Sequence, residues 1–260
     1  WAWRVPFVIG GVFGLISIYL RRFLQETPVF KKMRESKALA KFPLEEVVKT
    51  SRFGIWISMF ITWVLTGCIV VFILLMPGFV GGVLGFSPFE TTYFQMGGLV
   101  CIVSSCWLTG RLADKHNPST LCILFSAGFA VSSVAFFSLL YTAAPVVSEV
   151  VLAYFATCFF AGIMNFCPIF MCDVFPARIR FSGISFAYNI AYALSGAFTP
   201  QLSFALHAYA KTHPDTLGAM GLSAYIVFLA LVSIGTALAM RRVYKNGGAA
   251  VSQMEFRPAP

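Results

Sequence analysis

Apolar residues occupy consecutive positions over long stretches of this chain, and polar residues gather in the segments between them. A bilayer core about 30 Å thick requires about 20 apolar residues of helix. Membrane-spanning strands would instead alternate apolar and polar residues over about ten positions. Because backbone groups in lipid must be satisfied within each helix, the pattern predicts an all-α polytopic membrane protein with about seven transmembrane helices. The predicted spans are Val5–Leu24, Phe53–Met76, Tyr93–Thr109, Thr120–Ala143, Glu149–Cys172, Phe181–His207 and Leu217–Met240.

The composition agrees with this pattern, since 58% of the residues are hydrophobic, 11% are charged and the mean hydropathy is +0.81. A chain this apolar cannot present a wetted surface on all sides, so lipid is the expected solvent for most of it. The seven cysteines lie in or at the ends of predicted spans without a C-x-x-C pair, as is typical of small packing residues. With three histidines in the chain, we expect no metal site, no cofactor and no histidine-based catalytic set.

Basic residues are unevenly divided between the segments that join the spans. Lys and Arg number nine in residues 21–52, two in 111–115, two in 178–180 and four in 241–257, which is 17 of 19. The positive-inside rule therefore places these alternate segments in the cytoplasm, with the N-terminus outside and the C-terminus cytoplasmic. This asymmetry and anionic lipid headgroups account for the net charge of +9, so we expect no nucleic-acid partner.

The short segment between the third and fourth predicted spans reads G-R-L-A-D-K at positions 110–115. Glycine permits a close backbone approach at the end of a span, the acidic residue can lie against a helix N-terminus or an arginine, and the basic residues anchor at headgroups. This order of six residues resembles the G-x-L-A-D-K/R signature of the major facilitator superfamily.

Two further segments resemble the metabolite:proton symporters of that superfamily, which include proline/betaine, shikimate and oxoglutarate carriers. The opening W-R-V-P-F at 3–7, followed by E-T-P-V-F at 26–30, resembles the start and exit of their sixth helix. The loop F-P-A-R-I-R at 175–180 resembles the one before their eleventh helix. Asp173 stands where many members have Glu, so a carboxylate is kept.

The resemblance covers essentially the whole chain and implies helices six to twelve of a twelve-helix carrier. Residues 1–24 would be the last helix of the N-terminal bundle, 25–52 a cytoplasmic linker, 53–243 the C-terminal six-helix bundle and 244–260 a cytoplasmic tail. Because the sequence starts at Trp1 without Met, we expect a piece of a longer protein. The missing N-terminal helices would be its partner in the cell (inner) membrane.

The implied function is secondary active transport: proton-coupled symport of a small metabolite, such as an organic acid or a zwitterionic osmolyte, by alternating access. No Asp, Glu, Lys or Arg lies in the middle of a predicted span. Intramembrane ionisable residues are the usual proton relays, so the proton-carrying group is expected in the missing helices. The substrate itself is not named by the sequence.

Neutral side chains are then the candidates for this chain's share of the substrate cavity. Polar residues recur at three- and four-residue steps in the second, fifth and sixth predicted spans, which places them on one face of each helix. For the Ser and Thr residues, hydrogen bonding across helix interfaces is a better explanation than lining of the cavity. For the two asparagines both explanations stay open. The candidates are Trp63, Asn165, Tyr188, Asn189 and Tyr192.

Charged residues on two short cytoplasmic loops are the candidates for a cytoplasmic gate. In the resembled fold these loops approach each other when the carrier is closed to the cytoplasm, so carboxylates and guanidinium groups can pair there. The candidates are Arg111, Asp114, Lys115, Asp173, Arg178 and Arg180.

A seven-helix signalling receptor is the alternative with the same helix count and topology. The two loop motifs and the lack of D-R-Y and N-P-x-x-Y elements argue against it. An intramembrane enzyme would need a nucleophile with a nearby base or a buried acid pair, so the chain is not expected to be an enzyme.

Overall fold

The computed structural model describes residues 2–23, 31, 34–35, 43–142, 144–213 and 216–245. Within these ranges the chain is helical and contains no strand, which confirms the all-α prediction. Contacts divide the chain into two compact units, Trp1–Leu39 with Phe256–Pro260, and Ala40–Glu255.

The first unit contains the short 3-10 helix η1 (Ala2–Arg4) and the helix α1 (Val5–Arg21). Pro6 lies in the first turn of α1, where the missing backbone N–H would have had no partner inside the helix. The predicted first span is thus helical as far as Arg21, and its last residue, Leu24, lies outside the described residues.

The second unit contains the remaining elements. They are α3 (Pro43–Thr50), α4 (Arg52–Cys68), the π-helix η2 (Ile69–Leu75), α5 (Met76–Leu84), α6 (Pro88–Ala113), α7 (Pro118–Leu140), α8 (Val147–Phe160), the 3-10 helix η3 (Ala161–Asn165), α9 (Phe166–Val174), α10 (Ala177–Thr212) and α11 (Thr216–Lys245). Five described helical segments are long and apolar enough to cross a membrane, with α4–η2–α5 and α8–η3–α9 each counted as one. They match five of the predicted spans. The span predicted to end at Met76 continues as helix to Leu84.

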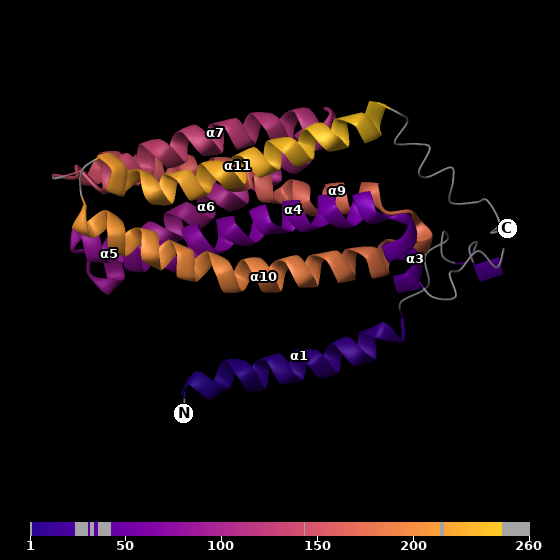
Figure 1. The fold of residues 1–260 in the computed structure, drawn as a ribbon. Helices are drawn as coiled ribbons and strands as arrows, with labels where there is room; N and C mark the ends of the chain where they lie inside the picture. The colour runs from indigo at the N-terminus through magenta and orange to yellow at the C-terminus, as the bar shows by residue number, and fades with distance from the viewer. Residues whose placement is uncertain are drawn as a thin grey trace. The chain divides into compact units, whose positions relative to one another are not determined.

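Two helix pairs dominate the packing of this unit. Helix α7 lies along α11, and α10 lies along α4, as Figure 1 shows. Helix α8 packs against both α6 and α7. Rings of Phe72, Phe129, Phe136 and Phe137 meet in the core between η2 and α7. The apolar spans of this unit are therefore partly buried against neighbouring helices.

Helix α10 has one face of small residues. Gly183, Ala187, Ala191, Ser195 and Thr199 follow each other at four-residue steps and are all buried. Small residues at this spacing let two helix backbones approach closely in a membrane. The larger aromatic and amide side chains of α10 lie outside this face, and α10 is not among the five apolar spans.

Candidate functional site

Trp63 of α4 belongs to a buried polar network with α10 and α11. Its indole Nε1–H donates to the hydroxyl of Tyr225 at 3.4 Å, and that hydroxyl lies 2.7 Å from Thr199 Oγ1. Ser195 Oγ lies 3.3 Å from Thr199 Oγ1 and 3.5 Å from the carbonyl oxygen of Trp63. The network fixes the Trp63 ring where three helices meet, and the ring itself is only partly buried.

The exposed face of α10 begins beside this network. Phe198 meets the Trp63 ring edge-on at 6.1 Å. Tyr192 is exposed and stacks on the half-buried Tyr188 with centroids 5.4 Å apart. Asn189 lies between them in sequence and is exposed, and its amide donates to the carbonyl of Ser185 at 2.7 Å. The structure thus places four of the five cavity candidates along α4 and α10.

Asn165, the fifth candidate, ends the 3-10 segment η3 and is turned toward α6. Its side-chain amide donates to the carbonyl of Cys106 and to Thr109 Oγ1, both at 3.1 Å. Of the two explanations left open for this residue, hydrogen bonding between helices is the one that these contacts favour. The Asn165 side chain is half-buried at this position.

Three of the gate candidates lie around the loop between α9 and α10, and each has a partner close by. Tyr244 of α11 donates its hydroxyl to Asp173 Oδ2 at 2.5 Å, and Arg180 Nε donates to the carbonyl of Phe175 at 3.1 Å. Arg178 forms an ion pair with Glu46 of α3. In this structure Arg178 therefore pairs with α3, whereas the gate hypothesis expected a pair between the two short loops.

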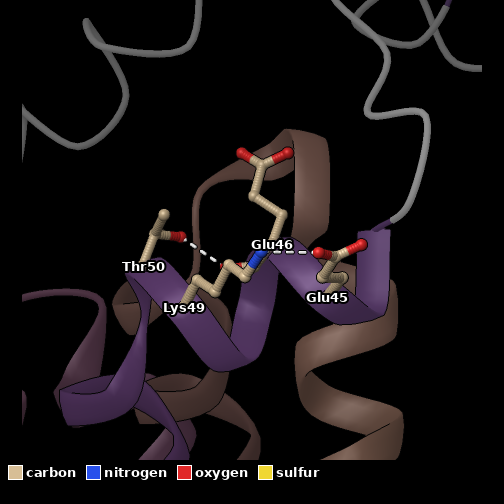
Figure 2. A network of polar contacts seen from close by, with 4 residues as sticks. All are labelled: Glu45, Glu46, Lys49 and Thr50. Atoms are coloured by element: carbon tan, nitrogen blue, oxygen red, sulfur yellow. Dashed lines mark hydrogen bonds and ion pairs between the residues drawn. The ribbon is translucent and has the colours of Figure 1, made fainter.

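Helix α3 brings Glu46 to this loop. Val47 is fully buried against Phe175 and Ile179, so the helix is docked on the start of α10 through an apolar contact. On its outer side, Lys49 Nζ lies 2.5 Å from Glu45 Oε1, and Thr50 Oγ1 donates to the carbonyl of Glu46 at 2.7 Å. Figure 2 shows the Glu46 carboxylate pointing away from the Glu45–Lys49 pair.

The other three gate candidates lie at the end of α6. The guanidinium of Arg111 lies over the Trp107 ring at 4.2 Å, a cation–π contact. Asp114 caps α6 through its backbone N–H, which donates to the carbonyl of Gly110 at 3.2 Å. The side chains of Asp114 and Lys115 are both exposed, so they are accessible to a partner at this end of the bundle.

Comparison with known proteins identifies the family. The model of the Major Facilitator Superfamily matches residues 1–200 of the chain. The chain belongs to the Major Facilitator Superfamily. The signature at 110–115 and the loop at 175–180, on which the resemblance was based, both fall inside the matched region.

Curated relatives in the superfamily carry the names of transporters. The inner membrane metabolite transport protein YhjE of Escherichia coli is 29% identical over 236 residues, which cover 85% of this chain and 50% of that protein. A protein of Staphylococcus haemolyticus provisionally named a proline/betaine transporter is 23% identical over 203 residues, covering 77% and 42%. The alpha-ketoglutarate permease of E. coli is 23% identical over 206 residues, covering 79% and 47%. No solved structure matches at a significant level.

The chain spans about half the length of the curated relatives it matches. The multi-pass membrane assignment and the metabolite-transporter family are confirmed, and the relatives are transporters and not enzymes. Nothing in these comparisons supports the receptor alternative. Among the described residues there is also no group of three side chains arranged to hold a metal ion.

Sequence reasoning missed three residues of these sites. Tyr225 and Tyr244 lie on α11, whose aromatic residues gave no periodic polar signal. Glu46 lies in the predicted cytoplasmic linker and is not among the gate candidates. A signal for Glu46 did exist, because Val47 next to it is an apolar residue inside a polar segment and indicates a docked helix.

Proposed function

We propose that this chain supplies the C-terminal half of a proton-coupled metabolite symporter that works by alternating access. The observation that carries the proposal is the exposed aromatic and amide face of α10, next to the Trp63 network. In a superfamily whose bundles pair around a midplane site, such a face is suited to lining the cavity between them. The partner bundle, residues 1–24 included, would be the N-terminal helices.

The side chains of this face define what the chain can offer a substrate. Tyr188 and Tyr192 present rings and hydroxyl groups, Trp63 presents its ring, and Asn189 presents an amide. These neutral groups bind hydroxyl, carboxylate and onium parts of a small metabolite, while the countercharge and the proton-carrying group come from the partner bundle. Zwitterionic osmolytes and organic acids fit this description, and the names of the relatives point to the same classes.

Uptake of labelled metabolites tests the proposal. The full-length gene product, expressed in cells that lack such carriers, should take up at least one of radiolabelled proline, glycine betaine, 2-oxoglutarate or shikimate in a saturable way. Uptake should increase when the outside is made more acidic and should stop when a protonophore is added. Saturable uptake that is indifferent to both treatments would contradict proton coupling, and a failure with all four substrates would count against this substrate class.

A variant pair tests the face itself. Tyr192→Ala removes a ring that is 40% exposed and stacked on Tyr188, so the KM of the transported substrate should rise about tenfold. Tyr209→Ala removes a ring that is 50% exposed near the end of the same helix, and it serves as the matched control. Equal KM values for the two variants, at matched membrane abundance, would exclude Tyr192 from the cavity.

A further inference from the structure

The second membrane span changes its helical register halfway along. It begins as the α-helix α4, widens into the π-helix η2 over Ile69–Leu75, and continues as α5 from Met76. The second residue of α5 is Pro77, which has no backbone N–H. In α register, residue 77 would donate to the carbonyl of Ile73, and in π register to that of Phe72. Pro77 therefore leaves one carbonyl without its donor in each register.

Side chains from two other helices bind these same two carbonyls. Gln95 Nε2 of α6 donates to the carbonyl oxygen of Ile73 at 2.6 Å. The hydroxyl of Tyr154 of α8 donates to that of Phe72 at 2.9 Å. In a bilayer, an unpaired backbone carbonyl is energetically costly because no water can bind it, so each bond removes a local penalty. The two side-chain donors thus bind the same two carbonyls that Pro77 leaves without a backbone donor. This match carries the inference.

Helix α6 supplies the space that Tyr154 needs. The Tyr154 side chain is buried and stacks on Phe94 with centroids 4.1 Å apart. A Cβ at Gly98, one turn farther along α6, would lie 2.5 Å from Tyr154 Cε1 and 2.7 Å from its hydroxyl oxygen. Only glycine leaves the ring in the position from which its hydroxyl reaches Phe72. One face of α6 thus provides both the Gln95 donor and the room for the Tyr154 donor.

We propose that η2 is a hinge between α4 and α5, and that Gln95 and Tyr154 are the positioning residues that fix its register by binding the two carbonyls left open by Pro77. A change of register by one residue rotates the following helix by about 100°. The two side chains hold α5 against such a rotation, and release of either one frees it. This device goes beyond the proposed transport function, and its test needs no substrate.

Hydrogen–deuterium exchange in the full-length gene product, purified in lipid nanodiscs, provides the test. Tyr154→Phe and Gln95→Met each remove a donor while keeping the size of the side chain. Amides in residues 69–84 should then exchange about three- to tenfold faster, as expected for the loss of one hydrogen bond. Amides of α7 (118–140) should be unaffected and serve as the internal reference. Tyr93→Phe removes the hydroxyl of an exposed tyrosine on α6 and is the matched control.

Pro77→Ala supplies the missing N–H and separates this device from ordinary packing. In that background, Tyr154→Phe and Gln95→Met should together have a smaller effect than in the parent, because the new N–H occupies one of the two carbonyls. Equal effects in both backgrounds, or unchanged exchange in the two single variants, would overturn the proposal. If Tyr154→Phe fails to accumulate, recovery by Pro77→Ala supports the proposal, and failure in both backgrounds counts against it.

Discussion

Glu46 of α3 and Arg178 of α10 form an ion pair in which 23% and 28% of the respective side chains are exposed. On the same short helix, Glu45 and Lys49 form a second pair whose side chains are 56% and 69% exposed. The two pairs differ in how much water surrounds them and in what they join. The first links two elements far apart in sequence, and the second lies within one turn of one helix (Figure 2).

This difference leads to a prediction about the stability of the docked helix. Glu46→Gln should lower the free energy of unfolding by about 1 kcal/mol, because the half-buried Arg178 loses its charge partner. Glu45→Gln should change it by less than about 0.5 kcal/mol, since an exposed pair within a helix contributes little. Thermal unfolding of the two variants in the same detergent makes the comparison. A larger loss for Glu45→Gln would show that α3 is held by its own helix contacts and not by Arg178.

The second prediction concerns the cytoplasmic gate. The Asp114 side chain is exposed at the end of α6, and Arg178 pairs with Glu46. We propose that a change of state in the full-length protein exchanges one partner of these charges for another. An interfacial pair of this kind is worth about 0.5–2 kcal/mol, which shifts a two-state equilibrium several-fold. Asp114→Asn and Arg178→Ala in the full-length gene product should each slow transport several-fold and leave KM nearly unchanged. Wild-type rates for both variants at matched membrane abundance would contradict the gate hypothesis.

The third prediction uses two glycines of α10 with different surroundings. A Cβ at Gly183 would lie 2.6 Å from Phe175 Cδ1, whereas a Cβ at Gly196 would meet nothing within 4 Å. Gly183→Ala should destabilise the protein by about 1–3 kcal/mol, because the buried Phe175 ring must move. Gly196→Ala should be neutral or stabilising by up to about 1 kcal/mol through its higher helix propensity. The melting temperatures of the two variants test this difference. Equal shifts would show that the Phe175 ring moves aside without loss of stability.

The fourth prediction tests the orientation in the membrane. His116 lies in the exposed turn between α6 and α7, and His213 lies exposed at the end of α10. The positive-inside rule places the first in the cytoplasm and the second outside. In a background where the native cysteines are replaced by serine, an impermeant maleimide applied to intact cells should label His213→Cys and spare His116→Cys. The reverse result would invert the topology and remove the cytoplasmic gate with it.

The sequence by itself determined the all-α membrane fold, the approximate positions of five apolar spans and the family. Hydrophobic length is a local property, because each helix satisfies its own backbone groups in lipid, and it can therefore be read from consecutive residues. The loop signature at 110–115 was recognisable for the same reason, since its six residues are contiguous. Even α10, whose small and polar residues lower its hydropathy, was predicted as a span.

The partners of individual side chains were decided only by the tertiary structure. Trp63 meets Tyr225 across 162 positions of the chain, and such a contact depends on how α4 and α11 are rotated about their own axes. The hydrogen bonds from α6 and α8 to the carbonyls of Ile73 and Phe72 likewise depend on how these helices pack on the second span. A proline read in isolation predicts the end of a helix, because the sequence does not show which neighbours will bind the carbonyls it leaves open. Hydropathy measures the preference of a residue for lipid over water. It carries no information about which faces of two helices pack against each other.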